Sequence, residues 1–378
     1  MRQIARADDS LFARWWWSVD RPLVAMLAPI ILIGAAALTA AGPAAADRLR
    51  ISNEFYFPMR QAIFMVPTLA VMIGVSFFTP LQARRFGVLV FVGAILLMFG
   101  ALIFAPEVNG AKRWLYFGGV SLQPSEFAKP GFVIAAAWMM AEGARDPRFP
   151  GGAIAIGLYA LFAGLLILQP DFGQWILVTG VWMAMFFVAG WNWKWMATVG
   201  GVGMFALGLA YKFSDHVSAR IDGFLKPDGS ETYQVDRALE TIANGGLIGR
   251  GDARAVKGAL PDAHTDFSFA AAAEDFGLVF GVVVIALFCG LVVRAMMVAV
   301  RQNSAFVQCA ITGLAAMIGA QAIINIGVSL RALPAKGMTL PFISSGGSSL
   351  VATGITVGLL IALTRGHFGR HRRKDLMP

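Results

Sequence analysis

The sequence predicts an all-α, polytopic integral membrane protein with about ten transmembrane helices. Its 378 residues are 57% hydrophobic and only 14% charged, whereas soluble chains are about 45–50% apolar and about 25% charged. The mean hydropathy is +0.67, and apolar runs near the length of a bilayer span recur along the chain. These values exclude a soluble enzyme and a disordered chain. Lipid requires internally paired backbone groups, and the sequence lacks the short alternating strands of a membrane barrel.

Residues 1–22 precede the first apolar run and carry arginines, acids and the cluster Trp15–Trp17. A cleavable signal peptide has a short basic start followed directly by an apolar stretch, so we expect this segment to stay in place. Tryptophans beside arginines are typical of the membrane–water interface. The segment is therefore expected at the cytoplasmic surface.

Ten apolar runs with approximate ends form the predicted membrane domain, residues 23–365. They are Leu23–Ala41, Gln61–Phe78, Phe86–Phe104, Glu126–Met140, Ala153–Leu168, Gln174–Ala189, Trp195–Tyr211, Phe267–Val300, Phe306–Leu330 and Ser348–Leu363. A basic tail, residues 366–378, follows the last run and is expected in the cytoplasm.

The Lys and Arg residues predict the orientation, because short cytoplasmic loops carry an excess of them. With the N-terminus inside and ten alternating spans, 16 of the 31 Lys and Arg residues fall inside and 15 outside. Seven of the outer ones belong to one long loop, and without that loop the ratio is 16 to 8. Six of the 22 acidic residues fall inside. Both termini are therefore expected in the cytoplasm.

The long loop, residues 212–266, joins the seventh and eighth predicted helices on the outer, periplasmic side. Loops of this length are usually functional or disordered. This loop is polar and rich in glycine, but Tyr233–Gly246 is amphipathic. The pattern predicts a partly ordered loop.

Charged residues near the outer ends of the spans are candidates for function, because charges at membrane depth are costly. The first group comprises Lys112, Arg113, Trp114, Glu126 and Lys129. Glu126 and Lys129 are three residues apart on one helix face and can form an ion pair. Two interpretations stay open: a site for an anionic substrate, or headgroup anchors beside a structural ion pair.

The second group lies where the long loop meets the eighth helix. Asp266 stands at this boundary, where partial desolvation raises the pKa of a carboxyl group unless a cation offsets the effect. A pKa near the working pH suits a general base. The alternative is that Thr265 or Asp266 is the N-cap of the helix. Glu274 and Asp275, two turns deeper, are expected in an internal hydrogen-bonded network.

The third group lies between residues 325 and 349. Arg331 and Lys336 supply positive charge, and Ser348 and Ser349 follow two glycines at the start of the last helix. A turn rich in Gly and Ser at a helix N-terminus can hold an anion; a re-entrant loop without a ligand is the alternative. Asp171, before the sixth helix, is predicted to be a helix cap rather than a ligand.

Several other functions lack support in the sequence. Walker A, H-E-x-x-H and G-x-S-x-G motifs are missing. The four histidines have no ligand spacing, and the two cysteines lie in apolar runs, so no tightly bound zinc and no disulfide framework are predicted. A divalent cation, Mg²⁺ or Mn²⁺, held between a carboxylate and a pyrophosphate is left open. The net charge of +9 is dispersed between apolar runs, which indicates inner-loop charges rather than nucleic-acid binding.

Four segments together resemble the SEDS family of shape, elongation, division and sporulation proteins. They are NGAKRWLYFGGVSLQPSEFAKP, YQVDRALETIANGGLIGRG, LPDAHTDFSFAAAAEDFG and NIGVSLRALPAKGMTLPFISSGGSS, and they occur in family order. The last two are more similar to the cell-division branch than to the elongation branch. The chain differs from the cell-division branch at Ser268, Asp275, Ala335 and Ser345, where Ile, Glu, Thr and Tyr are usual.

The resemblance implies a ten-helix peptidoglycan glycosyltransferase of the inner membrane. Such enzymes polymerise lipid II into glycan strands, and they act with a class B penicillin-binding protein and other membrane proteins of the division site. By position, the family's essential aspartate is Asp266. The other motif positions, implied to bind substrate, are Lys112, Arg113, Trp114, Gln123, Ser125, Glu126, Lys129, Lys336, Ser348 and Ser349. Arg331 joins this set because of its charge.

The mechanism that we expect from this resemblance uses Asp266 as the base. Asp266 takes the proton of an acceptor sugar's 4-hydroxyl as that oxygen attacks the anomeric carbon of the donor strand. Cations stabilise the leaving pyrophosphate; these would be Lys112, Arg113, Arg331 and Lys336. Two other functions fit the same segments: a transporter of lipid II, and a scaffold that only recruits division proteins. Formation of polymer from lipid II, lost on Asp266→Asn, distinguishes the enzyme from both.

Overall fold

Helices make up most of the chain, as the sequence predicts. The computed structural model describes residues 10–108, 110–191, 193–213, 218, 230–250, 258, 260–333 and 337–366. The elements are α1 (Leu11–Ser18), α2 (Arg21–Arg48), α3 (Tyr56–Ser76), α4 (Pro80–Phe104), β1 (Leu115–Phe117), β2 (Val120–Leu122), α5 (Pro124–Arg145), α6 (Gly151–Leu168), α7 (Phe172–Val188), α8 (Trp193–Phe213), α10 (Ser230–Gly245), α11 (Ser268–Val300), α12 (Ala305–Ser329) and α13 (Gly347–Thr364). Within these described ranges, each of the ten predicted apolar runs coincides with one helix.

The apolar helices confirm a polytopic membrane fold. Among the described residues, seven helices are long and apolar enough to cross a membrane, and α7 is a shorter apolar helix. The seven are α2, α3, α4, α6, α11, α12 and α13. Large apolar side chains on the outer helices, such as Leu89, Phe104 and Val300, are exposed. Such exposure suits a surface in contact with lipid, because contact with acyl chains carries no hydrophobic penalty.

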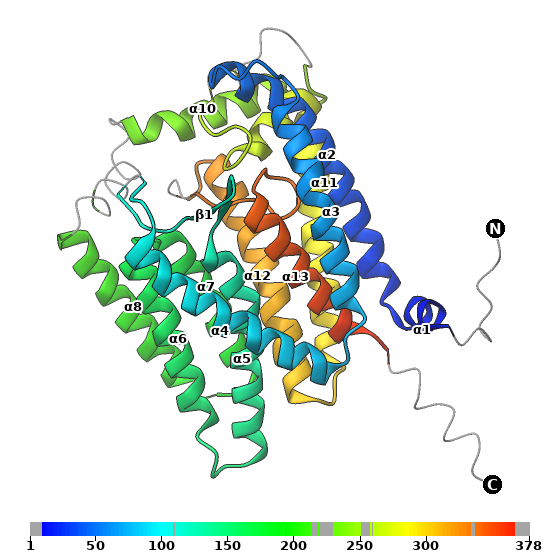
Figure 1. Cartoon of the computed structure of the whole chain (residues 1–378), viewed down its shortest axis with the longest axis vertical. Coiled ribbons are helices and arrows are strands. Elements are labelled where there is room, and N and C mark those ends of the chain that lie inside the picture. The colour runs from blue at the N-terminus through cyan, green and yellow to red at the C-terminus, as the bar shows by residue number, and fades with distance from the viewer. Residues whose placement is uncertain are drawn as a thin grey trace.

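Helices α12 and α13 form the centre of the bundle. Their apolar windows are 72% and 83% buried, whereas the windows of the other five spans are at most 39% buried. Helix α13 packs on α3 and α5, and α12 packs on α5, α7 and α11 (Figure 1). The segment just before α13, residues 340–345, is buried among the remaining elements.

The two ends of the bundle differ. At one end, which we call the terminal end, α1 and the last turn of α13 lie together (Figure 1). Arg365 Nε donates to Ser18 Oγ at 2.9 Å, and Arg294 donates to both carboxylate oxygens of Asp20 at 3.0 and 2.7 Å. The opposite end, the loop end, holds α10 and the strands β1 and β2.

The two strands form a short hairpin that the sequence analysis did not predict. They are antiparallel, and Leu115 pairs with Leu122 and Phe117 with Val120. The turn consists of Gly118 and Gly119, which both have positive φ, at +53° and +84°. Positive φ at both central residues is the geometry of a tight hairpin turn that favours glycine. The hairpin places the residues before α5 against the start of α13.

Helix α11 is interrupted at Gly277, where φ is +80° and ψ is −179°. The turn after α10 fills the gap, because Leu278 N donates to Gly246 O at 2.9 Å. One turn earlier on α11, the buried Glu274 Oε1 accepts from Asn244 Nδ2 at 2.5 Å. The expectation that Glu274 belongs to an internal network is confirmed, and the amphipathic stretch of the long loop forms α10.

Candidate functional site

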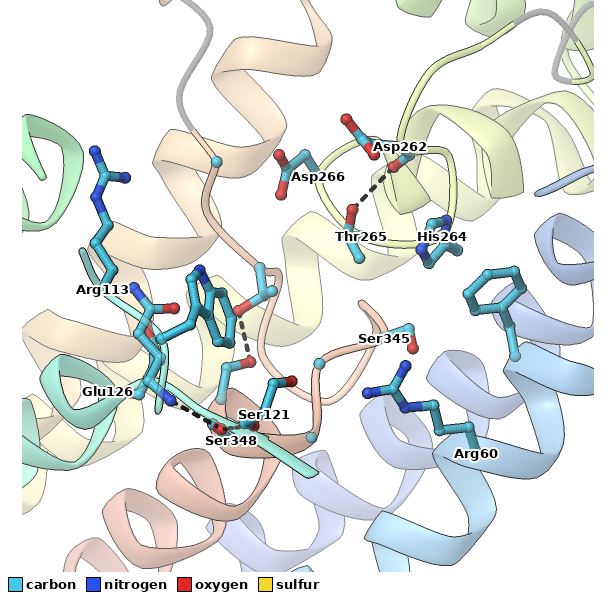
Figure 2. A pocket seen from close by; sticks show the side chains of 18 of the residues that line it. Arg60, Arg113, Ser121, Glu126, Asp262, His264, Thr265, Asp266, Ser345 and Ser348 are labelled. Carbon is cyan, nitrogen blue, oxygen red and sulfur yellow. Dashed lines mark hydrogen bonds between the residues drawn. The ribbon is translucent and has the colours of Figure 1, made fainter. Parts of the chain in front are cut away.

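A pocket of about 400 Å³ lies at the loop end, where segments distant in the sequence meet. The start of α3, the hairpin region, the turn before α11 and the loop before α13 all contribute (Figure 2). The lining residues are Phe57, Arg60, Arg113, Trp114, Ser121, Gln123, Glu126, Asp171, Asp262, His264, Thr265, Asp266, Gly337, Thr339, Ser345, Gly346, Gly347, Ser348 and Ser349. Seven of the predicted site residues are among them.

Asp266 belongs to a tight turn that directly precedes α11. Its backbone N–H donates to the Asp262 carbonyl at 3.1 Å. The N-cap position of α11 is occupied by Phe267, which makes no side-chain cap bond, so the alternative that Thr265 or Asp266 is the helix cap is wrong. The carboxylate faces the pocket wall instead: a Cβ added at Gly337 would lie 3.2 Å from Asp266 Oδ2.

Arg113 is fixed at the opposite side of the pocket (Figure 2). Its Nε donates to Gln169 O at 2.7 Å, and NH1 lies 3.9 Å from Asp171 Oδ1. Asp171 caps α7, as predicted, by accepting from Gln174 N at 3.5 Å, and it also accepts from Gln123 Nε2 at 3.3 Å. Burial raises the pKa of Asp171 above its ordinary value, and the nearby charge of Arg113 opposes this rise.

The predicted ion pair between Glu126 and Lys129 is confirmed. Lys129 Nζ lies 2.9 Å from Glu126 Oε1, and the two side chains are only 3% and 5% exposed. The same oxygen accepts from Gln174 Nε2 at 2.7 Å. Glu126 lines the pocket, whereas Lys129 and the buried Ser125 lie behind the lining. The charge of Lys129 is therefore compensated by Glu126.

Ser348 and Ser349 line the pocket, and their hydroxyls bond to other parts of the wall. Ser348 Oγ donates to Ser121 O at 2.8 Å and accepts from Gln123 N at 3.2 Å. The Ser349 hydroxyl lies 2.8 Å from the Thr339 hydroxyl. Ser348 thus joins the hairpin to the first turn of α13, which supports the shape of the pocket.

Besides Lys129, three predicted cations are not part of the described lining. Lys112 is half-buried beside the hairpin, outside the lining. Arg331 lies outside it too and forms an ion pair with Asp236 of α10, with NH1 2.6 Å from Oδ1. Lys336 falls outside the described residues. Trp114, by contrast, lines the pocket.

Arg60, Asp262 and His264 also line the pocket, although they are not among the site residues predicted from the sequence. Arg60 lies in the first turns of α3, one residue before the predicted start of that span, so a charge at the outer end of a span was the available signal. The imidazole of His264 packs on Phe57, with ring centroids 3.9 Å apart. Burial lowers the pKa of His264; the charge of Asp262 opposes this effect, and that of Arg60 adds to it.

Fold and site together define a multi-pass membrane protein with a polar pocket at one end, lined by both carboxylates and arginines. A family model described as cell cycle protein, which covers FtsW, RodA and SpoVE, matches residues 21–367. The chain belongs to this family, and the resemblance to SEDS proteins is confirmed.

Similar proteins of known sequence carry the same family name. A protein of Caulobacter vibrioides is 42% identical over 362 residues, which cover 96% of this chain and 93% of the relative. A protein of Halomonas elongata is 35% identical over 375 residues, covering 96% and 94%. Both are named probable peptidoglycan glycosyltransferase FtsW. With the apolar helices, these relatives indicate a multi-pass protein of the inner membrane.

Solved structures share the fold. A chain of a peptidoglycan synthase complex that coordinates polymerization and crosslinking matches with a TM-score of 0.77 at 27% identity, covering 92% of this chain and 98% of that chain. The rod shape determining protein RodA of Thermus thermophilus matches with a TM-score of 0.69 at 28% identity, covering 92% and 97%.

Proposed function

We propose that this protein is a peptidoglycan glycosyltransferase that polymerises lipid II into glycan strands during cell division. One observation carries the proposal most directly: the Asp266 carboxylate and the Arg113 guanidinium line the same pocket at one end of the bundle. A proton acceptor and a cation on two sides of one pocket suit a reaction in which a hydroxyl attacks and a diphosphate leaves. The names of the FtsW relatives support the same activity.

Asp266 acts as the general base in the proposed reaction. It takes the proton of the acceptor's 4-hydroxyl as the oxygen bonds to the anomeric carbon of the donor strand. The bond from that carbon to the undecaprenyl diphosphate breaks in the same displacement, so the configuration inverts. General base catalysis contributes about 10²–10⁴-fold to a rate. The backbone turn before α11 and the wall at Gly337 hold this carboxylate in place.

Among the described residues, the cations that reach the pocket are Arg113 and Arg60. In the proposed reaction they stabilise the negative charge that develops on the leaving diphosphate. Preorganised cations of this kind are often the largest catalytic contribution. Lys112, Arg331 and Lys336 stay in the proposal as cations that an incoming lipid headgroup meets near the pocket. Lys129 acts through Glu126, because the two form a buried ion pair.

A resident metal ion does not fit the described donor set. Among the residues with described positions, no three His, Cys, Asp or Glu side chains converge as metal ligands would. The proposed reaction therefore uses no metal bound by the protein. Whether Mg²⁺ or Mn²⁺ enters with the diphosphate is tested by adding EDTA to the polymerisation assay.

In the proposed membrane orientation, the loop end faces the periplasm and both termini face the cytoplasm. The polar headgroup of lipid II then enters the pocket from the outer leaflet while its tail stays among lipids. The similarity to a chain of a peptidoglycan synthase complex supports a class B penicillin-binding protein as partner. The FtsW relatives support work at the division site with other division proteins.

The test uses the purified full-length chain, alone and with its penicillin-binding protein, incubated with lipid II. We expect glycan polymer on a gel, and we expect Asp266→Asn to lower its rate by about 10²-fold or more. Asp146→Asn, an exposed aspartate after α5 at the terminal end, is the matched control. Lipid II movement across vesicles without polymer would instead indicate a transporter. Full complementation of a deletion strain by Asp266→Asn would indicate a scaffold.

A further inference from the structure

A buried amide on α12 connects the Asp266 turn to the loop that forms the neighbouring wall. The Asn325 side chain is 1% exposed. Its Nδ2 donates to the carbonyl oxygen of Asp266 at 2.8 Å and to the carbonyl oxygen of Met338 at 2.6 Å. A single NH₂ group, which has two hydrogens to donate, thus bonds two segments that are far apart in the sequence.

The second segment passes close to the Asp266 carboxylate. Gly337 precedes Met338, and a Cβ built on Gly337 would lie 3.2 Å from Asp266 Oδ2. Asn325 therefore fixes both the backbone that carries the carboxylate and the backbone beside it. A small shift of either segment would change where the carboxylate points.

Further bonds join the same two segments away from Asp266. Ser345 N donates to His264 O at 2.8 Å, and the hydroxyls of Ser268 and Ser344 lie 2.7 Å apart. These bonds attach the turn before α11 to the loop before α13 at points away from the Asp266 carboxylate. The Asn325 bonds differ from them because they reach the Asp266 residue itself.

The amide makes these bonds at a cost to its own oxygen. Asn325 Oδ1 is buried and has no hydrogen-bond partner among the described residues. A buried acceptor without a partner destabilises a fold, and such groups call for an explanation. The explanation here is that the NH₂ group of the same amide holds two carbonyl groups in place beside the pocket.

We propose that Asn325 is a positioning residue that sets the orientation of the Asp266 carboxylate toward the acceptor hydroxyl. The inference rests on the proposed glycosyltransferase function. Misplacement of a catalytic group lowers the rate of the chemical step more than it lowers substrate binding. The signature is therefore a loss in kcat with little change in KM for lipid II.

The test compares three variants of the full-length protein. N325L keeps the approximate size and removes both donors, and N325D keeps the shape but replaces the NH₂ group by an oxygen. Ser329→Ala is the control, because Ser329 bonds to the Asn325 carbonyl within α12 and not to the pocket. We expect N325L and N325D to lower kcat at least ten-fold with KM changed less than three-fold. The control is expected to stay within two-fold of the parent.

Hydrogen exchange separates this role from a general loss of stability. In N325L, we expect faster exchange in peptides covering residues 262–268 and 337–345, with unchanged exchange in α5 and α7. Unchanged exchange in the two segments, or a full kcat in folded N325D, would overturn the proposal. If N325L is not recovered folded, N325D is judged by both readouts. Should the parent make no polymer, the glycosyltransferase function fails, while exchange still reports whether Asn325 holds the turn.

Discussion

The buried ion pair of α5 gives a prediction whose size follows from its burial. Lys129→Met removes the cation and leaves the Glu126 carboxylate, 5% exposed, with the Gln174 amide at 2.7 Å as its described partner. Breaking a buried pair by removing one partner costs about 3–5 kcal/mol, because an uncompensated charge stays buried. We therefore expect Lys129→Met to lower the free energy of unfolding by this amount.

The same helix supplies the control. Arg145 and Glu142 have the same spacing of three residues, but their closest N–O distance is 3.7 Å and the side chains are 82% and 37% exposed. Exposed pairs contribute only about 0.2–1 kcal/mol, so Arg145→Met should cost no more than that. Unfolding in detergent micelles, followed by titration with a denaturing detergent, measures both variants under one condition.

The double variant Glu126→Gln with Lys129→Met tests the cause of the loss. If the cost comes from the unpaired carboxylate, neutralising that group should recover at least half of the stability lost in Lys129→Met. Equal losses for Lys129→Met and Arg145→Met would refute the reasoning. So would a double variant that loses as much stability as Lys129→Met and the single variant Glu126→Gln lose together.

Three further predictions concern the loop end. Gly337→Ala places a methyl group 3.2 Å from Asp266 Oδ2, so we expect a polymerisation rate several-fold below the parent; an unchanged rate would contradict this position of the carboxylate. Gly277→Ala forces a side chain into a backbone conformation at φ +80° and against residues 247–249, which should cost at least about 1–3 kcal/mol in unfolding free energy; a normal stability would argue against the break in α11. Burial lowers the pKa of His264 below its ordinary value, so the unfolded chain binds the proton more readily. Stability should therefore fall as the pH drops below about 6.5, and His264→Gln should weaken that pH dependence; an unchanged dependence would contradict it.

Much of the fold follows from the sequence, because lipid allows so few backbone structures. The run Phe267–Val300 was predicted as one helix, and α11 occupies almost the same residues. Its break was not predicted, because the cause is the turn after α10, which bonds to Leu278 and fills the gap. The hairpin was missed for a different reason: Gly118 and Gly119 are a recognisable turn signal, but strands this short have little periodicity.

The site shows which electrostatic contacts a sequence can reveal. Glu126 and Lys129 were paired correctly, because both lie on one helix and helical spacing fixes their distance. Arg331 was assigned to the substrate by its charge alone, whereas its position beside Asp236 depends on how α10 packs, which no local pattern specifies. Arg60 was missed for the converse reason, because its part in the pocket depends on the packing of α3 beside the turn before α11. A sequence therefore locates charges along the chain, but only the tertiary structure shows which of them line the pocket. That position decides which cations can meet a diphosphate in the pocket.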